Sequence, residues 1–307
     1  MRALVVTNMY PTPERPASGP FVRDQVEALR RRGDVEVELF AFPAGTRNYP
    51  RAARELRRRY GGEAFDVVHV HFGLVAWPAL LAGLHPLVVT LHGNDLLHPR
   101  SRPATLGALP FMDLPAAVSR AFSENVPGDR PIAVLPVGID TTRFRPIPRA
   151  EARERLGLDL DGPYLLFPHD TSRPLKRFDR AQEAAGDVRL LTLGGVPAEE
   201  VPYWINAANA VVVPSQDEGM GLAVIEASAC DVPAFGTPVG AHAVSLAGID
   251  GSACMPWDRD AWRAALAPHV AARDPRVDGR AAAERFSADR MAARVVAAWR
   301  ALLDEAA

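Results

Sequence analysis

Short apolar runs rich in valine and leucine alternate along the first half of the chain with stretches whose apolar residues recur at helical spacing. A run that ends in a polar loop predicts a buried strand, and apolar residues three or four positions apart predict a helix. Strands that are buried on both faces and separated by helices are typical of a parallel sheet. The predicted strands of this half are 3–8, 35–40, 67–71 and 87–91, and a helix over 21–32 follows the first of them.

The same alternation begins again after the proline-containing stretch 145–148. This repetition predicts an α/β protein with two doubly wound, Rossmann-like domains. Such sheets bind ligands at the carboxyl ends of their strands, so two domains that face one another would share a central cleft. The predicted strands of the second half are 164–167, 188–193, 210–213 and 233–236, and an amphipathic helix over 287–303 follows, with Met291, Val295, Val296, Trp299 and Leu302 on its apolar face.

Composition narrows the class of protein. The 48 % of hydrophobic and 23 % of charged residues are those of an ordinary globular protein. The chain has no apolar run long enough to span a bilayer and does not start like a signal peptide, which predicts a cytoplasmic location. Two cysteines without a second pair argue against a disulfide framework or a zinc site. Residues 1–145 hold 18 arginines against 14 acidic residues, too small an excess for a nucleic-acid-binding protein.

The segment around residues 211–230 carries the most informative chemistry. A predicted strand runs into a loop, and Gly219 and Gly221 then open a predicted helix. Glycines let the backbone approach a diphosphate, whose charge the free N–H groups and the helix dipole stabilise. Glu218 and Glu226 lie near that helix start and could each hold a pair of hydroxyls. Spacing alone favours the plainer interpretation, in which Glu218 is a solvated loop charge and Glu226 is a helix-surface residue.

This segment resembles the E-x7-E signature of the GT-B glycosyltransferases of family 4, which lies within P-S-x-x-E-G-x-G-L-x-x-I-E-A-x-A-C, here residues 214–230. The resemblance extends over nearly the whole chain, through segments 8–25, 65–71, 90–95 and 135–144. It implies an N-terminal acceptor-binding domain over 1–145, a donor-binding domain over 146–286, and a C-terminal helix over 287–307 that returns to the N-terminal domain. The activity it implies is retaining transfer of a hexose from a nucleotide diphosphate sugar, foremost a UDP-sugar, to a small-molecule, lipid-linked or cell-envelope acceptor.

The resemblance also implies roles for single residues. Arg173 and Lys176 match a pair that clamps the donor diphosphate, and Lys176 is the only lysine among 35 basic residues. Glu218 would hold the sugar hydroxyls, Glu226 the ribose, and His92 would face the reacting sugar. The expected catalytic set is therefore His92, Arg173, Lys176 and Glu218, and the expected donor-binding set is Gly19, Gly195, Val196, Gly219, Met220, Gly221, Leu222 and Glu226.

Other polar candidates receive plainer interpretations. His69 and His71 alternate with valines and share one strand face, which favours packing in the core or at the edge of the cleft. Asp159 and Asp161 have the spacing of a metal motif but lie in a polar connector. The resemblance implies no metal and no other cofactor, because cations and helix dipoles would stabilise the leaving diphosphate. His169 is a further candidate near the diphosphate.

Three alternatives bear on function. The second domain is short for the family after residue 191, so the chain could be a nucleotide-sugar-binding protein without turnover, or one that needs a partner subunit. The joint presence of the expected catalytic residues argues against this reading. An NAD-dependent oxidoreductase is excluded because no G-x-G-x-x-G follows the first strand.

Five arginines between 51 and 59 suit either a solvated helix face or peripheral contact with an anionic membrane.

Overall fold

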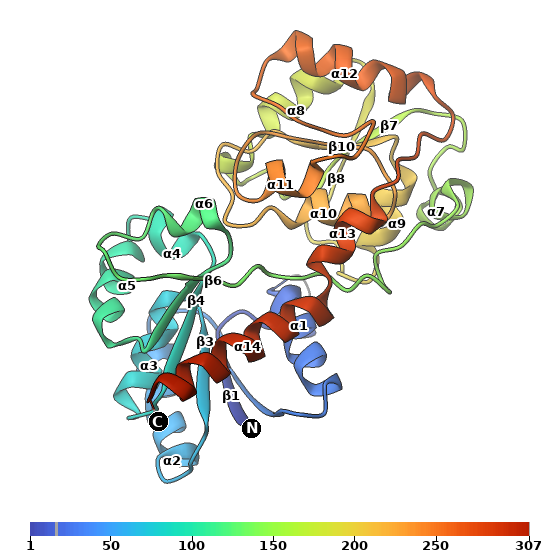
Figure 1. Cartoon of the computed structure of the whole chain (residues 1–307). Coiled ribbons are helices and arrows are strands. Elements are labelled where there is room, and N and C mark those ends of the chain that lie inside the picture. Colours follow the sequence, from blue (N-terminus) through green and yellow to red (C-terminus); the bar gives the residue numbers. More distant parts are fainter. Residues whose placement is uncertain (16–17, 307) are drawn as a thin grey trace. The chain divides into compact units, whose positions relative to one another are not determined.

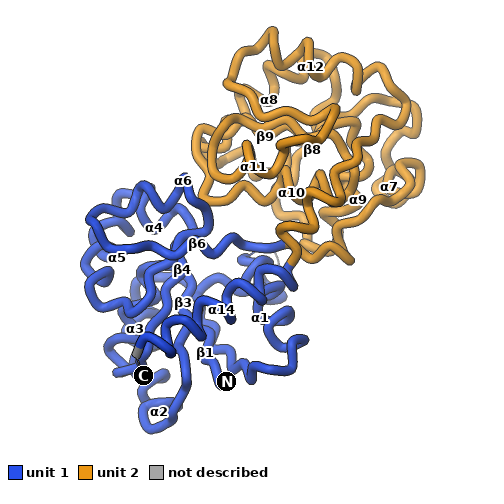
Figure 2. The backbone as a smooth tube through the Cα atoms, in the orientation of Figure 1, with its two compact units in different colours: residues 1–138, 288–307 blue, residues 139–287 orange. Residues whose placement is uncertain are grey.

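The computed structural model describes residues 1–15 and 18–306 and divides into two compact units (Figures 1 and 2). The N-terminal unit is Met1–Gly138 with Ala288–Ala307, and the C-terminal unit is Ile139–Ser287. Ile139, the first residue of the C-terminal unit, donates its backbone N–H to the carbonyl of Phe286 in the same unit at 2.9 Å.

The N-terminal unit is built on a six-stranded sheet in which every neighbouring pair is parallel. All five residues of the third strand and of the fourth are buried, as expected for strands covered on both faces. Both strands have the predicted bounds, and the first two differ from prediction by one residue. In spatial order the strands are β2 (Glu36–Ala41), β1 (Arg2–Thr7), β3 (Val67–His71), β4 (Leu87–Leu91), β5 (Leu114–Ala117) and β6 (Ala133–Val134).

Helices of this unit connect the strands, and the last helix of the chain packs beside α1. The apolar face predicted for that last helix is confirmed, since Val295, Val296 and Trp299 are at most 1 % exposed. The helices are α1 (Pro20–Arg31), α2 (Asn48–Tyr60), α3 (Ala76–Leu81), α4 (Asn94–Leu97), α5 (Arg102–Ala108), α6 (Arg120–Ser123) and α14 (Ala288–Ala306), with 3-10 turns η1 (Gly73–Val75) and η2 (Leu109–Phe111).

The C-terminal unit holds a second parallel sheet, so the prediction of two Rossmann-like folds is confirmed. Its strands, in spatial order, are β11 (Ala253–Cys254), β10 (Ala234–Gly236), β9 (Ala210–Val213), β7 (Tyr164–Phe167) and β8 (Arg189–Thr192). Its helices are α7 (Arg149–Leu156), α8 (Phe178–Ala185), α9 (Val201–Ala207), α10 (Leu222–Ala229), α11 (His242–Leu246), α12 (Arg259–Ala271) and α13 (Arg280–Ala283), with 3-10 turns η3 (Pro174–Lys176) and η4 (Glu284–Phe286).

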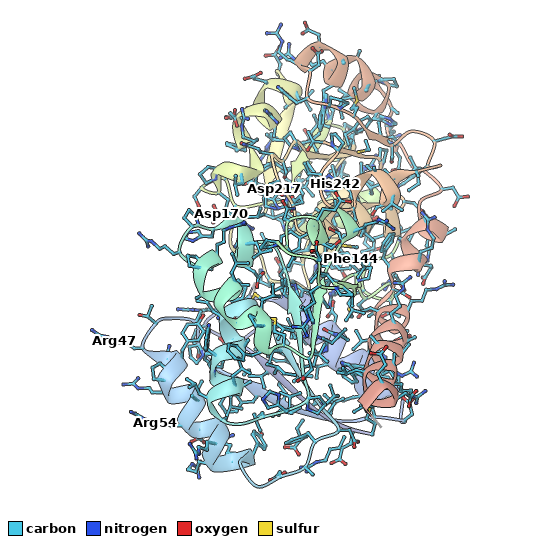
Figure 3. All side chains as sticks on the ribbon, turned by 60° about the vertical axis from the view of Figure 1, so that its left-hand side comes forward. Arg47, Arg54, Phe144, Asp170, Asp217 and His242 are labelled. Carbon is cyan, nitrogen blue, oxygen red and sulfur yellow. The ribbon has the colours of Figure 1, made fainter. Side chains whose placement is uncertain are left out.

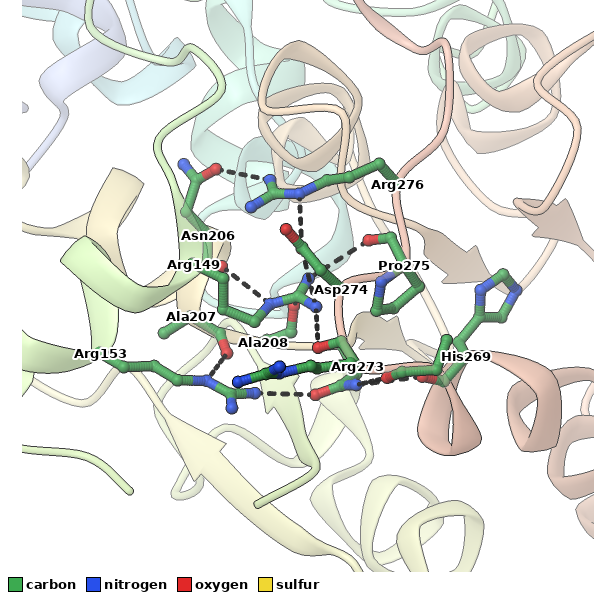
Figure 4. A network of polar contacts seen from close by, with 12 residues as sticks. Arg149, Arg153, Asn206, Ala207, Ala208, His269, Arg273, Asp274, Pro275 and Arg276 are labelled. Atoms are coloured by element: carbon green, nitrogen blue, oxygen red, sulfur yellow. Dashed lines mark hydrogen bonds and ion pairs between the residues drawn. The ribbon is translucent and has the colours of Figure 1, made fainter. Parts of the chain in front are cut away.

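Two buried arginines of α7 fasten the amino ends of β7 and β9 (Figure 4). The guanidinium of Arg149 donates to the carbonyls of Asn206 and Ala208 and pairs with Asp274 at 3.0 Å. Arg153, only 1 % exposed, donates to the carbonyl of Ala207 at 3.0 Å and to the side chain of Asn209 at 3.0 Å. The loops at the carboxyl ends of the same strands are thus held on a braced sheet.

We expect Arg153→Met to destabilise the C-terminal unit by about 2 kcal/mol, because it leaves several buried acceptors without a donor. Urea denaturation would measure this loss. Nucleotide binding at saturating ligand is expected to stay unchanged, since Arg153 lies at the opposite end of the strands from the candidate site. The exposed neighbour Arg155→Gln is the control, and equal stabilities of the two variants would contradict the bracing role.

Candidate functional site

Three adjacent strands, β10, β9 and β7, end at one edge of the C-terminal sheet, and the loops that follow them pack together. The N–H of Gln216 donates to the carbonyl of Leu175 at 2.8 Å and joins the loops after β9 and β7. The N–H of Ala241 donates to the carbonyl of Met220 at 2.8 Å and joins the loops after β10 and β9. The predicted glycine loop therefore lies between its two neighbours in this layer.

Gly221 is the residue from which α10 begins, and its backbone requires glycine. Its φ of 84° is left-handed, and a Cβ there would lie 2.3 Å from Nε2 of His242. No side chain caps the N-terminus of α10, so its first N–H groups remain available. Free N–H groups and the positive end of the dipole favour an anion at this position.

Lys176 and Glu218 form a buried ion pair beside this helix start. Nζ of Lys176 lies 2.5 Å from one carboxylate oxygen of Glu218, and the hydroxyl of Ser215 donates to the other at 2.8 Å. Lys176 is 6 % exposed and Glu218 is 9 % exposed. Burial by itself would raise the pKa of Glu218, but the Lys176 ammonium lowers that pKa to about 2. Burial lowers the pKa of Lys176, and the charge of Glu218 opposes that shift.

Two neutral histidines flank Glu218. Nε2 of His169 lies 3.6 Å from the carboxylate, and burial lowers the pKa of His169 to about 3. Nδ1 of His242 donates to the carbonyl of Thr237 at 2.8 Å, which leaves its Nε2 with a lone pair. Both Nε2 atoms are buried and make no hydrogen bond within the described chain. Sequence reasoning named His169 only as a candidate and missed His242 and Ser215.

The other residues of this unit that were predicted for the site lie in or near the loops after β7, β8 and β9. Arg173 is exposed, just before η3. Glu226 is half-buried in α10, about one turn after its start. Gly195 and Val196 follow β8, the outer strand next to β7. The backbone N–H of Lys176 donates to the carbonyl of Arg173 at 3.0 Å, and the nearby charge of Arg173 acts to lower the pKa of Lys176. Gly219 and Leu222 are half-buried, whereas Met220 and Gly221 are buried.

His92 lies in the N-terminal unit, directly after β4, and its backbone is fixed by Asp95. The carboxylate of Asp95 accepts hydrogen bonds from the N–H groups of His92 at 2.6 Å, Gly93 at 3.1 Å and Gly73 at 2.5 Å. It therefore ties the loop after β4 to the loop after β3. Burial raises the pKa of Asp95 to about 6, although its backbone donors oppose the shift. This role of Asp95 was not predicted.

Aromatic contacts surround the ring of His92. Its Nε2 lies 3.0 Å from Nδ1 of His71, and the centroid of the Phe21 ring is 5.0 Å from that of His92. His69 stacks on His71 at 4.8 Å, and both side chains are buried, in line with the predicted packing. Gly19, the residue before α1, has a φ of 61°, and a Cβ there would lie 2.5 Å from the carbonyl oxygen of Met9. His92 and the Lys176–Glu218 pair belong to different units.

In the described part of the chain, no three histidine, cysteine or acidic side chains gather as metal ligands would. Nor does any described helix combine the length and apolar character needed to cross a bilayer.

Comparisons with known proteins agree on one family. Residues 3–143 match the model described as Glycosyltransferase Family 4, and residues 169–270 match that described as Glycosyl transferases group 1. A D-inositol 3-phosphate glycosyltransferase of Segniliparus rotundus is 30 % identical over 350 residues, which span 93 % of this chain and 74 % of the relative. A similar relative from Xylanimonas cellulosilytica is 29 % identical, over 91 % of this chain and 79 % of its own.

Solved structures share the fold. A sucrose-phosphate synthase from Thermosynechococcus elongatus has a TM-score of 0.76 at 18 % identity and covers 99 % of this chain and 100 % of its own. The Anabaena protein HepE, crystallised with UDP-glucose, has a TM-score of 0.71 at 15 % identity, over 97 % of this chain and 99 % of its own. These two similarities bear on the fold alone.

Proposed function

The chain belongs to glycosyltransferase family 4 and is a GT-B glycosyltransferase that acts on nucleotide sugars, and from that premise we propose a specific reaction. It moves a hexose from a UDP-sugar to an acceptor with retention of anomeric configuration and without a metal ion. The C-terminal unit binds the donor, and His92 of the N-terminal unit faces the reacting sugar.

The buried Lys176–Glu218 pair beside the uncapped start of α10 carries this proposal. An ammonium and free N–H groups suit the two phosphates of a nucleotide diphosphate, and a carboxylate suits the hydroxyls of the sugar attached to them. The cationic groups and the carboxylate lie within the same layer of loops. A nucleotide sugar has phosphates at one end and sugar hydroxyls at the other, so its binding requires both kinds of group close together. The UDP-glucose in the Anabaena structure makes UDP-glucose the first donor to test.

Departure of the sugar leaves the nucleotide diphosphate with increased negative charge. Lys176, the exposed Arg173 and the dipole of α10 would stabilise that charge electrostatically, and fixed charges in a buried site need little reorganisation. Gly219, Met220, Gly221 and Leu222 would offer backbone N–H groups to the same anion. Glu226 would hold the ribose, and Gly195 and Val196 would line the base. The chemistry then needs no Lewis acid from outside the chain.

A panel of UDP-, GDP- and ADP-sugars tests the proposal. We expect slow release of nucleoside diphosphate from one UDP-sugar in the absence of acceptor, undiminished by EDTA, and retention read from the anomeric proton of the transfer product. Arg177→Gln, a half-buried neighbour of Lys176 that pairs with Asp179, is the control and should leave the rate unchanged. Tight donor binding without release or transfer would favour the binding-protein alternative.

We also propose that α2 contacts an anionic membrane that carries the acceptor. Arg51, Arg54 and Arg57 are exposed, and Figure 3 shows Arg54 pointing away from the unit. Arg58 and Arg59 instead pair with Glu55. Leu81, 64 % exposed, belongs to α3, which packs beside α2. A basic helix with an apolar neighbour suits anionic headgroups.

Changing Arg51, Arg54 and Arg57 together to glutamine should weaken the free energy of binding to phosphatidylserine vesicles by about 1 kcal/mol per charge. Sedimentation with the vesicles measures this binding. The control removes three exposed arginines of the C-terminal unit, Arg155, Arg259 and Arg273. Equal binding by the two triple variants would exclude α2 as the contact.

A further inference from the structure

The contact between His71 and His92 gives a chemical role to a buried residue of β3. Nδ1 of His71 lies 3.0 Å from Nε2 of His92, a distance at which the two nitrogens share one proton and one lone pair. Burial lowers the pKa of both imidazoles, that of His71 to about 3. Both rings are therefore neutral near pH 7, and each carries a single proton.

The second nitrogen of His71 decides which ring donates. Nε2 of His71 is buried and has no hydrogen-bond partner in the described residues. If His92 were the donor, this nitrogen would carry an N–H group without an acceptor. If His71 is the donor, its Nε2 carries no proton and has only an unused lone pair. Orphaned N–H groups are rarer in native interiors than acceptors with unused capacity. The contact therefore favours donation from His71.

We propose that His71 is a positioning residue, which donates from Nδ1 to Nε2 of His92 and thereby keeps the proton of His92 on Nδ1. This role rests on the proposed reaction, in which His92 faces the reacting sugar. With its Nε2 occupied, His92 can offer a sugar oxygen only the N–H of Nδ1. His92 then acts as a hydrogen-bond donor and not as a general base.

Neighbouring contacts hold both rings in the orientation that this role needs. The ring of Phe21 packs on His92, and Asp95 fixes the backbone from which His92 projects. The ring of His69 stacks on the other side of His71, and its Nε2 shares a hydrogen bond of 2.7 Å with the hydroxyl of Thr90. The indole of Trp299 packs edge-on against the His69 ring, with 5.5 Å between the ring centroids. The His71 ring has little freedom to turn its Nδ1 away from His92.

Two variants of His71 separate this role from simple packing. Asparagine carries an amide N–H₂ at about the position of Nδ1, whereas phenylalanine keeps the ring and loses the donor. We expect His71→Phe to lower kcat/KM about tenfold, the worth of one hydrogen bond, and His71→Asn to stay within about threefold of wild type. A residue that only filled space would give the reverse order, because asparagine leaves a void.

Long-range ¹H–¹⁵N correlation spectra of the full chain labelled with ¹⁵N-histidine read the tautomer directly, with His92→Asn identifying the signals of His92. We expect a protonated Nδ1 in wild type and in His71→Asn, and both tautomers in His71→Phe. A protonated Nε2 in wild type, or an unchanged tautomer in His71→Phe, would overturn the proposal. This readout needs no substrate. If no nucleotide sugar reacts, the proposed function fails, while the spectra still decide the role of His71.

Discussion

Replacing Lys176 by alanine is expected to destabilise the C-terminal unit by about 3–5 kcal/mol, because the carboxylate of Glu218 then stays buried without its counter-ion. The same change should lower the rate of nucleoside diphosphate release at least about 100-fold, since the main buried cation of the site is lost. Urea denaturation and donor hydrolysis measure the two effects. An unfolded variant would look inactive for a trivial reason, so Lys176→Ala by itself says little about catalysis.

The double variant Lys176→Met with Glu218→Gln separates stability from catalysis. It replaces the ion pair by neutral groups of similar volume, and such replacements are often neutral or stabilising. We expect its stability to return to within about 1 kcal/mol of wild type while activity stays absent. Full activity of the folded double variant would refute the assigned roles of both residues.

Acidification from pH 7.5 to 5.5 is expected to remove about 4 kcal/mol of stability from the N-terminal unit through three histidines that are buried and neutral. Burial lowers the pKa values of His69, His71 and His92. The unfolded chain takes up a proton on each histidine below about pH 6.5, and the folded unit does not. Each therefore costs about 1.4 kcal/mol per pH unit below that value.

Carboxylates modify this slope in known directions. The raised pKa of Asp95, about 6, means that the folded unit gains a proton first, so Asp95 adds stability as the pH falls and offsets about 1 kcal/mol at pH 5.5. The lowered pKa of Glu218, about 2, removes stability from the C-terminal unit only as the pH falls from about 4.5 toward 2.

Urea denaturation at the two pH values measures the loss, with circular dichroism as the probe. His71→Phe should reduce the loss by about 1.4 kcal/mol, because one protonation is removed from the unfolded state. The exposed His98→Gln serves as the control for a change in histidine number. A stability that does not change between pH 7.5 and 5.5 would mean that the imidazoles are not held neutral by the fold.

Four strands buried on both faces could be predicted to the residue, because mostly apolar runs stand out from the polar loops on either side. Strands 67–71, 87–91, 164–167 and 210–213 are of this kind. The strand β5 was missed because Pro115 interrupts its sequence, and proline lacks the N–H of a central strand. The two-residue strands β6 and β11 exist only through their neighbours in the sheet.

The site was predictable only in part. Resemblance supplied Lys176 and Glu218, but their direct pairing depends on β7 and β9 being neighbours in space, which a separation of 42 positions along the chain does not reveal. The ring of His242 occupies space that is free because residue 221 is glycine, since a Cβ at that position would collide with the ring. Asp95 was visible in its motif, yet its three backbone partners come from two different loops. Each of these is a property of the tertiary structure.

Because Lys176 is the only lysine in the sequence, the reactivity of its amine reports on the state of this loop layer. Acylating reagents attack a neutral amine, and the chain has one ε-amine, whose side chain is 8 % exposed within its ion pair. The rate of ε-amine acylation therefore measures how often that pair opens, with no introduced label. A ligand that closes the loops over the amine would slow the acylation in proportion to its occupancy. Mass spectrometry of the acylated wild-type chain at increasing ligand concentration would then measure ligand binding.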